Sequence, residues 1–228
     1  MRPFSRLVLL TALGAAGTTG GLVAQVRGLP VRNAGIGTGI GVAADLGFPN
    51  GDAGKGVALG ATGHVGLGPL GFTASLATWD PKGATDRFTS VGATGNLKVF
   101  GGPLIPLSVT AQVGAAYSDE SSDDGTVTDE VWHVPAGIGI ALTIPNPLFS
   151  IKPWIAPRLD LARVKHTDPI ATSPVTNTDT HFGISAGVDL GFLGGLTFRA
   201  MYDRVEAGDG IHPSIVSIGA GYGFRLPL

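Results

Sequence analysis

Several long stretches of this sequence alternate strictly between apolar residues and small or polar residues. Between His181 and Phe192 every even position is apolar, and the odd positions hold glycine, serine, aspartate or histidine. The same alternation runs through residues 107–117, 131–144 and 218–226. Successive side chains of a β-strand point to opposite faces, so a two-residue period predicts strands with one apolar face. Helix signals are almost absent, because no window repeats apolar residues at helical spacing.

Ten segments meet this criterion, and most are long enough to cross a membrane at a tilt. They cover residues 35–48, 57–67, 70–79, 88–100, 107–117, 131–144, 151–164, 180–192, 196–205 and 214–226. Short connections such as Gly68-Pro69 alternate with long polar ones such as 118–130. Short turns on one rim and long loops on the other are typical of outer-membrane barrels. We therefore expect an all-β fold, a transmembrane antiparallel up-and-down β-barrel of ten strands, with eight strands as the alternative.

The composition indicates which face of the strands meets the surroundings. Only 14% of the residues are charged and 37 are glycine, whereas about a quarter of an ordinary soluble domain is charged. If the apolar face were an internal core, the other face would carry the Lys and Glu of a solvated surface. It carries mostly Gly, Ser, Thr and Ala instead. This predicts lipid on the outside and a narrow lumen filled by small residues.

The first 24 residues read as a signal peptide. Arg2 and Arg6 precede an apolar run at 7–16, and Leu22-Val23-Ala24 ends in small residues, as at a cleavage site. We expect residues 1–24 to be this signal, 25–34 a short N-terminal lead, and 35–228 a single barrel domain with both termini in the periplasm. The chain has no Cys, which excludes disulfides and thiolate chemistry. Its net charge of -2 lacks the excess of positive charge that indicates nucleic-acid binding.

Taken together, residues 32–226 resemble the small bacterial outer-membrane β-barrels of the OmpA or OmpX-like kind. The resemblance rests on the signal segment, the alternating strands and the last strand, 218–226, which is similar to the signal read by the barrel-assembly machinery. The chain departs from that signal by ending in Pro227-Leu228. The resemblance implies a monomer in the cell outer membrane of a Gram-negative envelope. It also implies outer-membrane lipid, lipopolysaccharide and the assembly machinery as partners.

The polar strand faces place charged side chains in the lumen. Their mixed signs predict structural ion pairs, because a buried charge without a partner is costly. The expected members are Asp45, Lys98, Arg158, Asp160, Asp189, Arg199, Asp203 and Arg225, with the lumen histidines His64, His133 and His181. The hairpin over 180–205 sets Asp189 opposite Arg199, so we expect these two to form an ion pair near Arg225.

We expect a non-enzymatic protein with a structural or surface-interaction role, or a narrow porin-like pore for small solutes, without cofactor or metal. One alternative is a hydrolase of the lipid A deacylase type, since His212 and Ser214 are similar to its His-x-Ser placement. Another is an omptin-like protease, which uses acids and a His above the barrel. The acids of 118–130 lie in one polar stretch, which is more simply a solvated loop. A metal site is a further alternative, with Asp123 and Asp124 or Asp168 and His166 as ligands, although the spacing matches no ligand loop.

Overall fold

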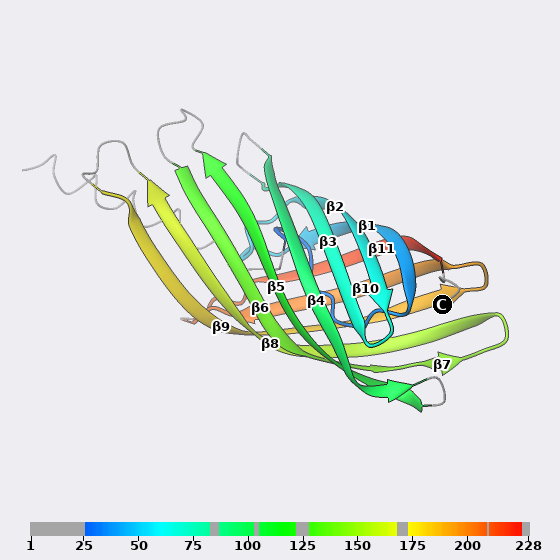
Figure 1. The fold of residues 1–228 in the computed structure, drawn as a ribbon. Helices are drawn as coiled ribbons and strands as arrows, with labels where there is room; N and C mark the ends of the chain where they lie inside the picture. Colours follow the sequence, from blue (N-terminus) through cyan, green and yellow to red (C-terminus); the bar gives the residue numbers. More distant parts are fainter. Residues whose placement is uncertain are drawn as a thin grey trace, which may run out of the picture.

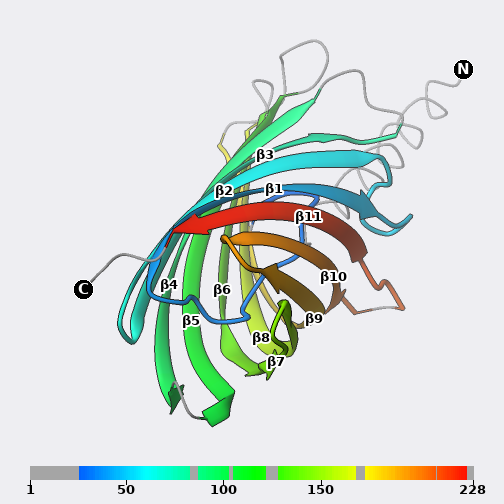
Figure 2. The same cartoon turned by 90° about the vertical axis from the view of Figure 1, so that its right-hand side faces the viewer.

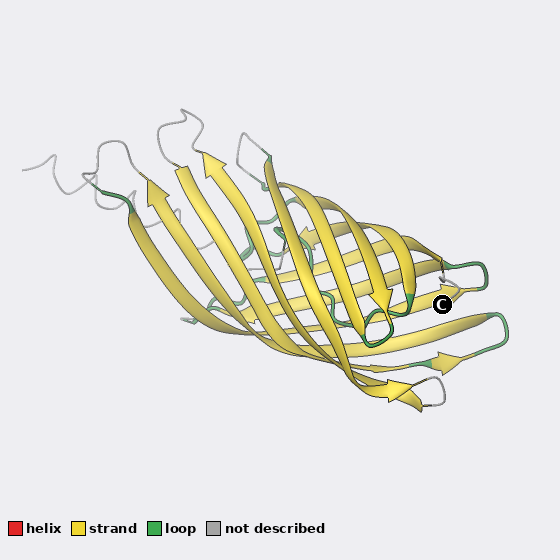
Figure 3. Cartoon of the chain, in the orientation of Figure 1, coloured by secondary structure: helices red, strands yellow, loops and turns green. Residues whose placement is uncertain are grey.

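The computed structural model describes residues 26–82, 87–102, 105–121, 128–167, 173–208 and 210–224. Within them, antiparallel strands wrap into a barrel (Figure 1). The strands are β1 (Gly39–Pro49), β2 (Val57–Leu67), β3 (Leu70–Asp80), β4 (Phe88–Gly102), β5 (Ile105–Ser121), β6 (Thr128–Leu142), β7 (Ile144–Pro145), β8 (Phe149–Thr167), β9 (Val175–Phe192), β10 (Leu196–Glu206) and β11 (Ser214–Phe224). Strands and connecting loops make up the whole described part of the molecule (Figure 3).

The barrel is closed. Each strand pairs with its neighbour in sequence except β6 and β7; β1 pairs with β11, and β6 pairs with β8. The short β7 continues the line of β6 and also pairs with β8, so the ring contains ten strands. The ten-stranded antiparallel barrel predicted from the alternation is therefore confirmed.

The strand registers agree with those expected from the sequence. Leu67 pairs with Leu70 and Val65 with Phe72 across the Gly68-Pro69 turn, where Gly68 adopts a φ of 62° that favours glycine. The short connections lie on one rim, called here the turn side, and the long ones lie on the other, called the loop side. Phe224, the last described residue, is on the turn side opposite Ile40.

The apolar strand faces point outward, as expected. Large side chains such as Val42, Phe72, Ile138, Phe182 and Ile218 are all exposed. The opposite face encloses polar residues, among them buried Asp45, Thr94 and Ser217. In the part of the chain that the structure describes, no helix is both long and apolar enough to cross a membrane.

Two sets of predicted boundaries are wrong. The first strand begins at Gly39 instead of residue 35, because residues 35–38 belong to a segment that turns into the lumen. β5, β6, β8 and β9 extend further toward the loop side than expected, through polar positions such as Asp119 and Glu130, which pair across β5 and β6. Backbone pairing continues there without an apolar face, so alternation could not reveal it. The predicted signal peptide lies outside the described residues.

Candidate functional site

The N-terminal lead fills the barrel. Residues 26–38, here called the luminal segment, cross the lumen as an irregular chain (Figure 2). The segment leaves β1 on the turn side, where Gly37 approaches Gly66. Its first residues lie toward the loop side, where Val26 and Leu29 pack into a buried cluster with Trp79. The first described residue thus lies inside the loop-side half of the barrel; the N-terminus that the sequence predicts to be periplasmic lies outside the described residues.

Glycines of the barrel wall make room for this segment. A β-carbon at Gly47 would lie 2.0 Å from the carbonyl oxygen of Gly28, and one at Gly139 would lie 2.0 Å from that of Asn33. A β-carbon at Gly60 would lie 2.1 Å from a methyl carbon of Leu29. Real side chains do not tolerate such contacts. The small luminal residues therefore do more than narrow the bore, because they form the groove in which residues 26–38 lie.

Hydrogen bonds tie the luminal segment to the wall along its length. The backbone N–H of Val31 donates to Asp203 Oδ2 at 2.9 Å. The backbone N–H of Arg27 donates to Ser90 Oγ at 2.9 Å, and its Nε donates to Ser118 Oγ at 3.0 Å. The amide of Gln112 donates to the carbonyl oxygen of Arg32 at 3.1 Å. These bonds satisfy backbone groups that the irregular chain would otherwise leave unpaired.

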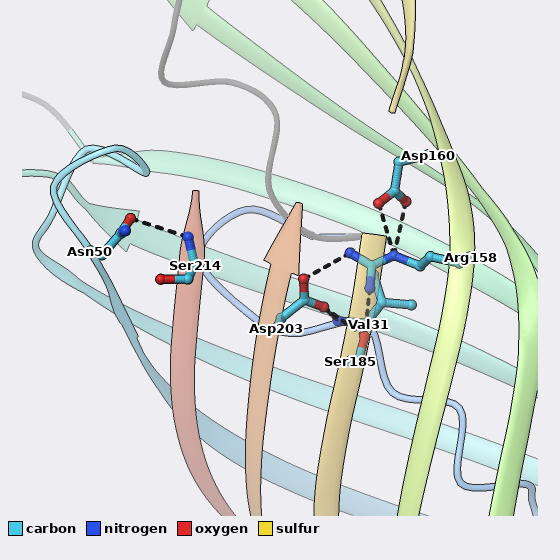
Figure 4. Close-up of polar contacts among 7 residues, drawn as sticks. All are labelled: Val31, Asn50, Arg158, Asp160, Ser185, Asp203 and Ser214. Carbon is cyan, nitrogen blue, oxygen red and sulfur yellow. Dashed lines mark hydrogen bonds and ion pairs between the residues drawn. The ribbon is translucent and has the colours of Figure 1, made fainter. Parts of the chain in front are cut away.

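Asp203, which accepts the hydrogen bond from Val31, belongs to a buried polar network (Figure 4). Arg158 on β8 donates to Asp160 at 3.0 Å, to Ser185 Oγ at 2.5 Å and to Asp203 at 2.8 Å. Ser185 Oγ in turn donates to Asp203 at 2.8 Å. Asp203 and Ser185 are 0% exposed, and Arg158 and Asp160 are each 4% exposed. Such a network gains its stability only when every charge keeps its partner.

The expected ion pair between Asp189 and Arg199 does not form. Their backbones do face each other across β9 and β10, as the register required. Arg32 of the luminal segment binds Asp189, however, and Arg199 binds Asp45 on β1. The indole N–H of Trp154 also donates to Asp189, at 3.4 Å. The prediction failed because strand register alone does not reveal a cation that enters from outside the sheet.

The other predicted luminal residues are more dispersed. Lys98 on β4 lies opposite Thr110, and His64 on β2 lies opposite Thr73. His133 is buried on β6, and His181 lies opposite Asp160, a member of the Arg158 network. Arg225 lies outside the described residues. The sequence reading missed Arg32 and Ser185 as members of the luminal network; Ser185 carried a signal, since it shares the polar face of β9 with Asp189.

At the outer face of the loop-side rim, His212 has an acid partner. His212 Nδ1 lies 2.7 Å from Glu206 Oε2, and Glu206 also pairs with Arg204 at 2.8 Å. The backbone N–H of Ser214 donates to Asn50 at 3.1 Å (Figure 4). Among the residues that the structure describes, no hydrogen bond joins the Ser214 hydroxyl to His212. The rim thus holds two components of a hydrolytic triad without the contact that would activate the serine.

Two acids of the loop-side strand extensions contact basic side chains of β8. Asp129 lies 2.5 Å from His166, and Glu130 lies 3.0 Å from Lys165. Asp123, Asp124 and Asp168 of the predicted metal alternative lie outside the described residues. Within the described ranges, no group of three or more His, Asp or Glu is placed to hold a metal ion.

No protein-family model matches this chain, and no curated protein matches it. Similar solved structures include the N-terminal β-barrel domain of Pseudomonas aeruginosa OprF, with 12% identity over 82% of this chain and 98% of that one, and a TM-score of 0.38. Neisserial surface protein A has 15% identity over 82% and 98%, with a TM-score of 0.40. The outer-membrane protease OmpT from Escherichia coli has 11% identity over 82% and 94%, with a TM-score of 0.43. The closed antiparallel barrel is shown by the strand pairing of this chain itself.

Proposed function

We propose that this protein is an integral outer-membrane β-barrel without enzymatic activity, whose lumen is closed by its own N-terminal segment. It serves a structural or surface-interaction role and is not an open pore for small solutes. The observation that carries the proposal is the luminal segment, which lies in a groove of wall glycines and hydrogen-bonds to buried Asp203. We expect a segment held in this way to interrupt the water path through the bore.

The exterior of the barrel supports a membrane location. Its outward faces carry large apolar side chains such as Val42, Leu76, Val113 and Phe198, which lipid would cover at no cost. Outer-membrane lipid and lipopolysaccharide are the partners proposed for this face, and the barrel-assembly machinery is the partner proposed for insertion. The charged extensions of β5, β6, β8 and β9, with their Glu130–Lys165 pair, are the surface proposed for outside contacts.

Conductance in planar lipid bilayers tests the proposal. The purified protein is expected to give no steady current. A matched variant lacking residues 26–36 is expected to conduct, because it keeps all strands but loses the luminal chain. Shift of the folded band on heating serves as the control that both proteins are folded. Steady conductance of the unaltered protein would contradict the closed-lumen role and favour the pore.

A hydrolase of the lipid A deacylase type is the second candidate. The contact between Glu206 and His212 favours it, since an acid that orients a histidine is part of hydrolytic sites. Mass spectrometry of lipid A from cells that express the protein tests this candidate. Loss of an acyl chain that His212→Ala abolishes would support it, and an unchanged lipid A profile would exclude it.

A further inference from the structure

The turn-side half of the lumen contains a cavity with an excess of cationic side chains. The cavity has a volume of about 220 Å³ and lies between the luminal segment and strands β1, β2, β8, β9, β10 and β11. Its lining includes the charged residues Arg32, Lys152, Asp189 and Arg199 and the histidine His64. It also reaches Ser150 and Gly223, close to the turn-side rim. Liquid water occupies about 30 Å³ per molecule, so the space is large enough for a small hydrated ion.

Both acids of this region are paired with arginine side chains. Asp189 is bound by Arg32, and Asp45 is bound by Arg199. Lys152 lies directly opposite Asp189 in the strand register, yet the carboxylate is shared with Arg32 and with the indole of Trp154. Among the described residues, neither Lys152 nor the neighbouring luminal Lys98 forms an ion pair. The described turn-side lumen therefore has four cations and two acids.

Two further observations place donors around the same space. The ammonium group of Lys152 lies within 4.0 Å of the position that a β-carbon at Gly35 would take, so it reaches the luminal segment. The Nε of Arg32 is buried and has no hydrogen-bond partner. Unpaired charged donors in a narrow lumen are costly. An anion would satisfy them.

We propose that this cavity binds a small oxyanion, of the size of phosphate or acetate, which enters from the turn side. Lys152 supplies the uncompensated charge. Arg32 and Arg199 form the wall, held in place by Asp189 and Asp45. The site rests on the same luminal segment as the proposed function, and anion binding is measured separately from conductance.

The indole N–H of Trp154 provides a direct probe, because it contacts Asp189 at 3.4 Å beside the site. In the full chain in neutral detergent, inorganic phosphate at constant ionic strength is expected to shift the ¹⁵N–¹H resonance of this indole with saturation. Acetate is expected to give a weaker saturating shift. Lys152→Met is expected to weaken the apparent affinity for phosphate at least tenfold. Lys165→Met, which alters a loop-side lysine paired with Glu130, is expected to leave it unchanged.

The outcomes separate the sources of the anion. A shift that is linear in phosphate, or that is equal in the Lys152→Met variant, would overturn the proposal. A shift caused by an anionic lysophospholipid but not by phosphate would overturn it too, because the ligand would then be a lipid headgroup. If Lys152→Met does not fold, Lys152→Gln replaces it, and Lys152→Arg is expected to restore binding to within a few fold.

Discussion

The Asp203 carboxylate, which is 0% exposed, accepts a hydrogen bond from the backbone N–H of Val31, a residue 172 positions earlier in the chain. The same carboxylate binds Arg158 at 2.8 Å. One buried acid thus joins the luminal segment to an ion-pair network of the wall. Loss of this acid would leave three buried donors without their acceptor: the backbone N–H of Val31, the Ser185 hydroxyl and one N–H group of Arg158.

Asp203→Ala is expected to lower the free energy of unfolding by at least about 1 to 3 kcal/mol, because buried donors of Val31, Ser185 and Arg158 lose their acceptor. Thermal unfolding in detergent, followed by the shift of the folded band, measures the effect. Asp80→Ala is the control, since Asp80 pairs with Arg87 at an exposed site, where the loss stays below about 1 kcal/mol. Equal effects of the two changes would contradict a buried network.

Gly47→Ala is expected to destabilise the protein by about 1 to 3 kcal/mol, as overpacking does. The new methyl group would lie 2.0 Å from the carbonyl oxygen of Gly28 in the luminal segment. Gly63→Ala is the matched control on the neighbouring strand, since a β-carbon there meets nothing within 4 Å. Chemical unfolding curves of the two variants decide the matter, and matching midpoints would show that no chain lies against Gly47.

Asp189 is expected to couple energetically to Arg32 more strongly than to Arg199. Arg32 binds the carboxylate directly, whereas Arg199 is engaged by Asp45. Double-mutant cycles with alanine at each pair measure the coupling, expected at about 0.5 to 3 kcal/mol for Asp189 with Arg32. A larger coupling between Asp189 and Arg199 would contradict this arrangement and support the cross-strand ion pair predicted from the register.

Ile218→Lys is expected to destabilise the barrel in lipid bilayers by about 2 to 4 kcal/mol, as for a charge at the lipid-facing midplane. Ile218 is 52% exposed near the middle of β11. Val57→Lys at the loop-side end of β2 serves as the control, where the cost falls to about 0 to 1 kcal/mol. Reversible folding into vesicles measures both values. A cost that does not vary with depth would place the outer face in water.

The barrel was predictable from the sequence because its main determinant is local. Alternation at residues 181–192 fixes which side chains face outward, and the Gly68-Pro69 turn fixes the register of its hairpin. The same two-residue period predicts that the side chains of Arg158, Asp160 and Asp203 face the lumen. These residues were correctly placed together on the inward side.

The luminal segment was not predictable, because it has no period. Residues 35–38 continue the glycine alternation of β1 and were assigned to it, although they leave the sheet. Arg32 then binds Asp189 from inside the barrel, and nothing in the strand pattern signals a cation from that direction. The small luminal residues were predicted only to fill a narrow lumen, whereas Gly47, Gly60 and Gly139 lie against the luminal segment.

Disulfide trapping tests the luminal position of the N-terminal segment most directly, because the chain contains no cysteine of its own. The Cδ1 atom of Leu29 lies 2.1 Å from the position of a β-carbon at Gly60, while a β-carbon at Gly63 points outward and meets nothing within 4 Å. The double variant Leu29→Cys with Gly60→Cys is expected to cross-link on mild oxidation of the folded protein, and Leu29→Cys with Gly63→Cys is expected to stay reduced. Failure of the first pair to cross-link in the folded barrel, or equal yields from both pairs, would contradict a segment held inside the lumen.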